Sequence, residues 1–121
     1  MMVTIHASQV TFIVDMSNET VVAGNGNYPA VYISGVNING PSGLEMNDNG
    51  DGTWQLTIDL QPGDYTYKFR NGYYPNTWSG GWESVPSSCG EGQYNDRIVV
   101  TESNDIDLDL ICFNRCKECE R

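Results

Sequence analysis

The sequence has few basic residues. It contains 6 lysines and arginines against 16 aspartates and glutamates, which gives a formal net charge of -10. Proteins that bind nucleic acid or anionic membrane surfaces carry a basic footprint, so this balance argues against both kinds of partner. The acidic residues are dispersed, apart from an alternating run at Asp105, Asp107 and Asp109. We interpret them as a solvated surface that favours solubility.

Long apolar runs are also missing. No stretch approaches the ~20 residues that a membrane-spanning helix needs, so we expect no membrane insertion. The first residues lack the basic and apolar regions of a signal peptide, and we interpret residues 1–8 as an artificial junction. The domain would then be a monomeric module of a longer chain. With 121 residues there is room for one domain, which we place at 9–112, followed by a cysteine-containing tail at 113–121.

No segment longer than one or two turns has the period of a helix. Short runs of alternating apolar and polar residues recur instead, separated by Gly, Asn and Pro. About seven such runs predict an all-β chain folded as an antiparallel β-sandwich. The expected strands are residues 9–15, 30–35, 44–46, 53–60, 65–70, 96–101 and 106–111.

The clearest pattern lies at residues 53–72. Apolar side chains alternate with polar ones on both sides of Pro62-Gly63, and Lys68 and Arg70 fall on the polar face. Pro fixes φ and Gly permits positive φ, so this segment predicts a β-hairpin with one face toward the core. The expected core side chains are Trp54, Leu56, Ile58 and Leu60 before the turn, and Tyr65, Tyr67 and Phe69 after it.

Cysteines are few but even in number. In a small acidic chain rich in Gly, Asn and Tyr, four cysteines favour an oxidising environment, and we expect an extracellular or cell-surface location. Four thiolates could also bind zinc, but a second C-x-x-C motif is absent, which favours disulfides. Of the three pairings that four cysteines allow, we expect Cys89–Cys112, tying a long loop to the last strand, and a small Cys116–Cys119 ring.

Residues 71–93 form a long segment without periodicity. A loop of this length in a compact domain is more often functional than idle. Trp78 and Trp82 lie among Ser and Gly, so we expect at least one exposed indole that can stack on the C–H face of a sugar ring. The alternative is that one of them caps the end of the sandwich. Tyr73 and Tyr74 are adjacent, so we expect only one of them to face outward.

Oxygen-bearing side chains alternate between residues 47 and 52. Asn47, Asn49 and Asp51 match the first half of a Ca²⁺-binding EF-hand loop. The twelfth position of that loop is Ile58 rather than Glu, and flanking helices are absent. Asn-Gly and Asp-Gly are also favoured hairpin dipeptides. We therefore expect no cofactor and prefer a plain turn to a weak Ca²⁺ site.

Catalytic groups are scarce. The single histidine, His6, lies in the N-terminal junction, and no serine lies in a nucleophile-elbow pattern. Glu83 and Glu91 lie in the long loop, and a glycosidase needs two carboxylates across a cleft. The sequence does not show that these two are paired or buried. We expect the domain not to be an enzyme but an accessory module, for example of a secreted enzyme.

Two segments carry a family resemblance. VYISGVNING at 31–40, followed by DGTWQLTIDLQPGDYTYKFRNG at 51–72, resembles the starch- and glycogen-binding modules of families 20 and 48. The match covers about residues 31–100 and implies an immunoglobulin-like β-sandwich. The VPSSCG segment, the Tyr94-Asn95 pair and the CFxxCxxC ending are also similar to repeats in large secreted proteins of marine Bacteroidota.

The resemblance implies sugar-binding roles for Lys68, Trp78 and Asn95. Where the family reads F-N-N-W, this chain reads NING at 37–40, so the first tryptophan platform is absent. Trp82 or Tyr74 would have to replace it for two successive glucose rings to be held.

Together these observations predict a non-catalytic carbohydrate-binding module for a neutral polysaccharide. Stacking would come from the aromatic residues, and hydrogen bonds from Lys68 and Asn95, with Arg70 and Gln93 as further candidates. The alternative is a structural or adhesion spacer of a secreted multidomain protein that binds no sugar. In that case both Trp78 and Trp82 would be buried.

Overall fold

Two β-sheets make up the chain in the computed structural model, which describes residues 7–35 and 37–120. These residues form nine strands and no helix, so the all-β prediction is confirmed and the expected count of about seven was too low. The strands are β1 (Ser8–Asp15), β2 (Val31–Gly35), β3 (Gly40–Glu45), β4 (Asn47–Asp48), β5 (Thr53–Leu60), β6 (Gly63–Asn71), β7 (Arg97–Thr101), β8 (Ile106–Asp107) and β9 (Ile111–Cys112).

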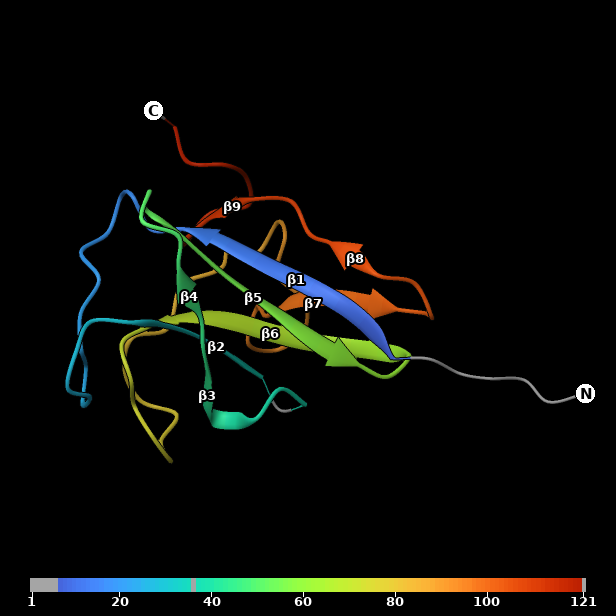
Figure 1. Ribbon diagram of the computed structural model, residues 1–121, viewed down its shortest axis with the longest axis horizontal. Helices are drawn as coiled ribbons and strands as arrows, with labels where there is room; N and C mark the ends of the chain where they lie inside the picture. Colours follow the sequence, from blue (N-terminus) through green and yellow to red (C-terminus); the bar gives the residue numbers. More distant parts are fainter. Residues whose placement is uncertain (1–6, 36, 121) are drawn as a thin grey trace, which may run out of the picture.

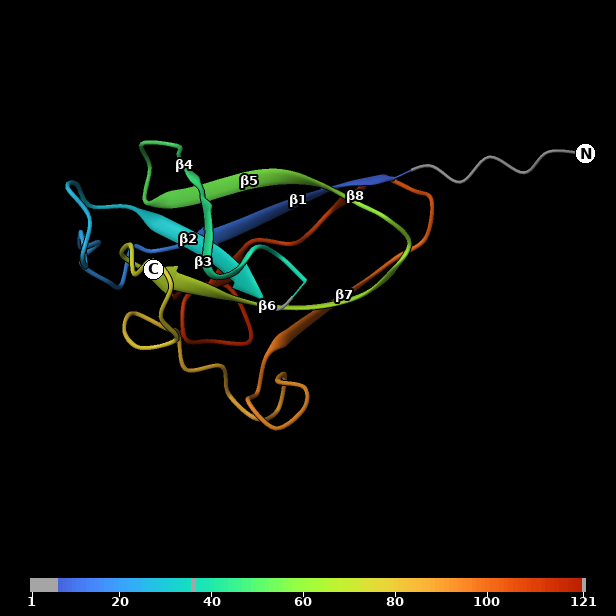
Figure 2. The same cartoon turned by 90° about the horizontal axis from the view of Figure 1, so that it is seen from below.

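The two sheets pack face to face as a sandwich (Figures 1 and 2). One sheet has the order β4-β5-β1-β8, and β9 also pairs with β1. The other has the order β3-β2-β6-β7 and is antiparallel throughout. The first sheet is mixed, because β8 and β9 run parallel to β1 while β5 runs antiparallel to it.

The predicted hairpin at residues 53–72 is wrong, because β5 and β6 lie in different sheets. β5 pairs with β1 and β4, whereas β6 pairs with β2 and β7. The Pro62-Gly63 turn therefore carries the chain across the sandwich, as the wide bend between β5 and β6 in Figure 2 shows. Thr101 holds this turn from β7: its hydroxyl donates to the Gln61 carbonyl at 2.8 Å and accepts from the Gly63 amide at 3.1 Å.

The predicted inward faces of β5 and β6 are nevertheless confirmed. Trp54, Leu60, Tyr67 and Phe69 belong to the core, and Leu56, Ile58 and Tyr65 pack against it. Phe12 of β1 meets Tyr67 of β6 across the interior, with ring centroids 4.8 Å apart. Both alternating patterns point at one core, from two sheets rather than from one.

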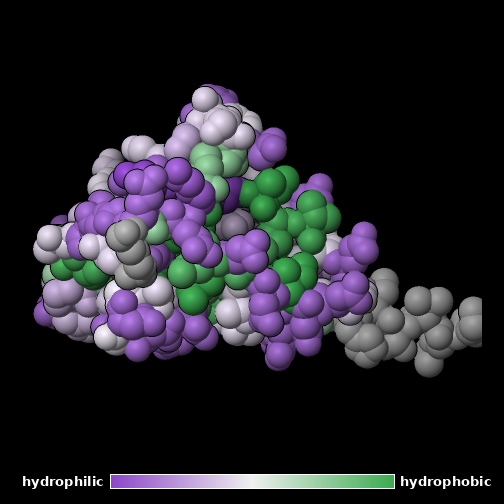
Figure 3. Space-filling model, turned by 90° about the horizontal axis from the view of Figure 1, so that it is seen from above, coloured by the Kyte–Doolittle hydropathy of each residue, from purple (hydrophilic) through white to green (hydrophobic). Residues whose placement is uncertain are grey.

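The last predicted strand is divided. Residues 106–111 were expected to form one strand, but only β8 and β9 pair with β1, and the chain between them does not. The predicted alternation of buried and exposed side chains is nevertheless present. Ile106, Leu108 and Ile111 pack against the core, while the intervening aspartates are exposed. Figure 3 looks down on this side and shows hydrophobic side chains lying between hydrophilic ones.

The disulfide prediction is correct in kind and wrong in pairing. Cys89 is bonded to Cys116, and Cys112 to Cys119. Cys112 ends β9 beside Asp15 of β1, and the tail folds back so that the amide of Cys112 donates to the Lys117 carbonyl at 2.8 Å. This return places Cys119 next to Cys112 and leaves Cys116 facing the loop that carries Cys89.

The segment 1–8, which we interpret from its sequence as a junction, lies largely outside the described residues. His6 and residues 1–5 fall there, whereas Ser8 already belongs to β1, one residue earlier than the predicted strand. The part of the chain that the structure describes has no helix with the length and apolar character to span a bilayer.

Core tyrosines make stability sensitive to high pH. Burial raises the pKa of Tyr67 to about 12, from about 10 in an unfolded chain. A buried phenol stays neutral while the unfolded chain ionises, so the stabilisation is complete below pH 10 and falls as pH rises toward 12. We expect the free energy of unfolding to drop by about 2–3 kcal/mol over this interval from Tyr67 alone.

Urea unfolding at pH 9, 10, 11 and 12 would measure this slope. Burial also raises the pKa of Tyr32, so a second tyrosine adds to the same trend. The control is Tyr67→Phe, which removes one titrating group and should flatten the slope. A slope that is identical in the two proteins would contradict the assignment to Tyr67.

Candidate functional site

A pocket of about 590 Å³ lies on the outer face of the β3-β2-β6-β7 sheet. Its floor comes from β2 and β6, and its sides from the β6–β7 loop (residues 72–96). The lining residues are Ser34, Gly35, Thr66, Lys68, Trp78, Trp82, Tyr94 and Asp96. The structure thus brings three predicted site residues together: Lys68, Trp78 and Trp82.

The floor of the pocket depends on the pairing of β2 with β6. Ser34 is the partner of Lys68 in this register. A Cβ atom on Gly35 would lie 2.1 Å from the Thr66 carbonyl oxygen, so a glycine is needed for the close approach of the two strands. The Ser34 hydroxyl is buried without a hydrogen-bond partner among the described residues. Thr66 was recognisable as a neighbour of Lys68 on the polar face, whereas Ser34 depends on the register.

Trp78 and Trp82 form one side of the pocket, which we call the aromatic wall. Their rings are stacked, with centroids 6.0 Å apart and planes inclined by 21°. The indole Nε1 of Trp82 donates to the Trp78 carbonyl at 2.7 Å. Trp78 is 54% exposed, although it is apolar over most of its surface. An exposed indole beside a pocket can stack on the apolar face of a ring-shaped ligand.

Lys68 lies opposite polar groups of the same pocket. Its ammonium group donates to the Tyr94 carbonyl and pairs with the Asp96 carboxylate, 3.4 Å away. The Asp96 carboxylate offsets the positive charge of the ammonium group, and the two contacts hold the lysine side chain across the floor. The arrangement offers both a donor and an acceptor within one small region, which is the pattern that hydroxyl groups of a neutral ligand can satisfy.

Asn95 lies in a tight turn beside the pocket rather than in its lining. The amides and carbonyls of Glu91 and Asp96 bond to each other at 2.8 and 3.0 Å, and Asn95 has a φ of 50° between them. Its neighbours Tyr94 and Asp96 line the pocket instead. The predicted residue thus lies beside the pocket but does not line it. Gln93 is exposed in the same turn.

Tyr74 and Arg70 lie behind the aromatic wall. The Tyr74 ring fits against glycines: a Cβ on Gly81 would lie 2.5 Å from it, and one on Gly80 2.8 Å. Arg70 was expected on a polar outer face, yet only 1% of it is exposed, because the β6–β7 loop covers it. Burial lowers the pKa of its guanidinium below the usual value. Neither side chain lines the pocket.

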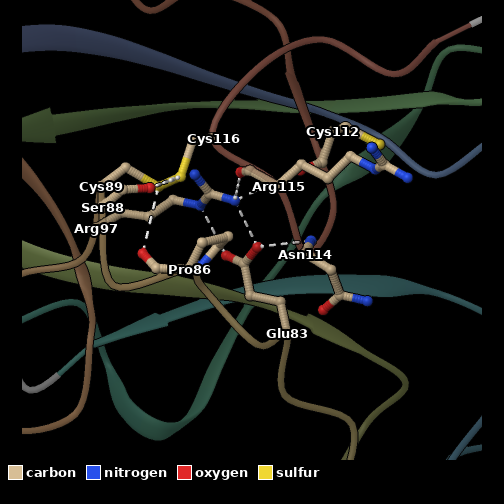
Figure 4. The surroundings of a disulfide bond; sticks show 9 residues. All are labelled: Glu83, Pro86, Ser88, Cys89, Arg97, Cys112, Asn114, Arg115 and Cys116. Carbon is tan, nitrogen blue, oxygen red and sulfur yellow. Dashed lines mark hydrogen bonds and ion pairs between the residues drawn. A yellow bond between two sulfur atoms is a disulfide. The ribbon is translucent and has the colours of Figure 1, made fainter.

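Glu83 and Glu91 do not form a pair. Glu83 is buried and bound to Arg97 by two hydrogen bonds of 2.8 and 2.6 Å (Figure 4). It also accepts from the backbone amides of Phe69 and Asn114 at 2.9 and 3.2 Å. Glu91 is exposed in the turn that precedes β7. Glu83 thus joins the loop to β6, β7 and the C-terminal tail.

The possible calcium ligands are engaged in a hairpin. β4 pairs with β5, and the Asn49 amide donates to the Thr53 carbonyl at 3.0 Å. The Asn49 side chain bonds to Thr53 and Gln55, and Asp51 accepts from the Thr53 amide. Asn47 is exposed within β4. Across residues 7–35 and 37–120, no three His, Cys, Asp or Glu side chains gather to hold a metal ion.

Comparison with known proteins assigns no family. No protein-family model matches this sequence, and no curated protein matches it.

Proposed function

We propose that the domain is a non-catalytic carbohydrate-binding module whose site is the pocket beside the aromatic wall. The observation that carries the proposal is the exposed Trp78, stacked on Trp82 at the edge of a polar floor. An indole supplies CH–π stacking, and Lys68 and Asp96 supply hydrogen bonds to hydroxyl groups. The half-exposure of Trp78 favours this function over the spacer alternative, which expects both indoles to be buried.

The charges at the pocket and over the whole chain favour a neutral ligand over an anionic one. Lys68 is already paired with Asp96, and the whole chain carries a formal charge of -10. An anionic sugar would meet this negative field without an unpaired cation at the pocket to receive it. We therefore propose a neutral polysaccharide. The two disulfides suit an oxidising environment, and an extracellular or cell-surface location belongs to the same proposal.

Replacement of Trp78 tests the site. Trp78→Ala should weaken glycan binding by roughly 10- to 100-fold, the scale of one lost stacking contact. It should lower the melting temperature only slightly, because the side chain is 54% exposed and loses mainly its stacking on Trp82. Affinity electrophoresis against amylose, laminarin, agarose and the anionic alginate would identify a ligand. Titration calorimetry would then give the affinities.

A matched control is available in Tyr28. It is 55% exposed, close to the 54% of Trp78, and does not line the pocket. Tyr28→Ala should bind as the unmodified protein does. Equal binding by the Trp78→Ala variant and the unmodified protein would rule out the platform, and preferential binding of alginate would rule out the neutral class.

A further inference from the structure

Arg70 is a buried cation without a carboxylate partner among the described residues. Its guanidinium bonds to backbone carbonyls instead. Nε donates to Gly80 at 2.7 Å, and one terminal nitrogen donates to Ser79 at 2.9 Å. The other terminal nitrogen donates to Pro41 at 2.7 Å and to Tyr74 at 3.3 Å. A buried charge is tolerated when it is hydrogen-bonded, and here backbone carbonyls of β3 and of the β6–β7 loop accept from all three nitrogens of the guanidinium.

Two aromatic rings face the same guanidinium. Its central carbon lies 4.1 Å from the centroid of the Trp82 ring and 4.9 Å from that of Tyr74. Such cation–π contacts strengthen when the cation is removed from water, as it is at Arg70. The Tyr74 ring packs directly on Gly80 and Gly81, so closely that a Cβ atom at either position would clash with it.

The contacts of Arg70 continue to the pocket through Trp82. The backbones of Arg70 and Trp82 form an antiparallel bridge, and the indole N–H of Trp82 donates a hydrogen bond to the Trp78 carbonyl. Trp78 stacks on Trp82. A chain of direct contacts thus runs from the guanidinium to the exposed indole.

We propose that Arg70 is a positioning residue of the pocket, which holds the aromatic wall in its stacked geometry before a ligand binds. The inference rests on the proposed carbohydrate binding, and it names the residue on which the platform depends. A wall that is already ordered loses little conformational entropy on binding. Lysine could not replace Arg70, because its ammonium has three donors, no planar fork and no extended face to stack on Trp82.

The test compares Arg70→Lys with Arg115→Lys, since Arg115 is an exposed arginine away from the pocket. Stacked indoles give an exciton couplet in circular dichroism, which reports the Trp78–Trp82 geometry without any ligand. We expect Arg70→Lys to lose most of this couplet, to bind glycan roughly tenfold more weakly, and to show a less favourable binding entropy. Arg115→Lys should match the unmodified protein in its exciton couplet, its glycan affinity and its binding entropy.

A folded Arg70→Lys protein with an unchanged couplet would overturn the proposal, as would a lost couplet with unchanged affinity. If no polysaccharide binds the unmodified protein, the proposed function fails, and the couplet still decides whether Arg70 orders the wall. If Arg70→Lys does not fold, NMR of the unmodified protein decides. The Arg70 Nε–H should be shifted upfield by the rings and protected from exchange, and exchange as fast as that of Arg115 would refute the role.

Discussion

Replacing Glu83 with alanine should lower the free energy of unfolding by about 3–5 kcal/mol. The variant leaves the Arg97 guanidinium buried without its carboxylate, and it removes the acceptor of two backbone amides, those of Phe69 and Asn114. The loss of one partner of a buried ion pair is costly because the remaining charge stays desolvated. Urea unfolding monitored by tryptophan fluorescence would measure the change.

Two control variants separate the contribution of the buried Glu83–Arg97 ion pair from other effects on stability. Glu91→Ala removes an exposed carboxylate of the same loop and should change stability by less than about 0.5 kcal/mol. The double variant Glu83→Leu/Arg97→Met should be less destabilised than Glu83→Ala, since neither charge remains. A loss below about 1 kcal/mol in Glu83→Ala would show that Arg97 finds water or another partner.

Removal of the Cys89–Cys116 disulfide should cost about 3–4 kcal/mol of stability. The bond closes a loop across a sequence separation of 27, and the entropy that it removes from the unfolded chain grows with loop length. Cys116 is exposed and Cys89 only partly buried, so Cys89→Ala/Cys116→Ala adds little cavity cost. Thermal and urea unfolding of this double variant would give the loss.

The stability contribution of the Cys112–Cys119 disulfide can be compared with that of Cys89–Cys116. Its sequence separation is 7, so chain entropy predicts a smaller contribution of about 2–3 kcal/mol. Mass spectrometry of a non-reduced digest would establish both pairings. A Cys89–Cys112 peptide would contradict the structure, and a double variant as stable as the unmodified protein would contradict the entropic argument.

Local patterns in the sequence predicted the longer strands, β1, β2, β5, β6 and β7, and the inward faces of β5 and β6. Alternation is a property of each strand, and the inward residues of β5 and β6 follow it. The same alternation cannot tell whether two consecutive strands pair or face each other across a core, because the apolar sets are identical in the two cases. This is why the Pro62-Gly63 turn was assigned to a hairpin. The predicted pairing of the cysteines was wrong for a similar reason, because the pairing depends on how the C-terminal tail folds back and not on a local pattern.

For the site, residue type identified Lys68, Trp78 and Trp82, and the structure places all three in one pocket. Ser34 of the floor was not found, because its position depends on the register between β2 and β6. The burial of Arg70 could not be predicted from the sequence. Alternation placed Arg70 on the outer face of β6, but the loop that covers it has no periodicity from which a contact could be inferred.

The parallel pairing of β1 with β9 has a mechanical consequence. β1 begins at one end of the domain and β9 lies beside its far end (Figure 1). Tension applied between Ser8 and Cys119 passes through the disulfide to Cys112 and bypasses the residues between them. It then pulls β1 and β9 along their length in opposite directions, so that the hydrogen bonds joining them are loaded together rather than opened in succession. Tension applied in this way would load the sheet that contains β1, whereas the pocket lies on the other sheet.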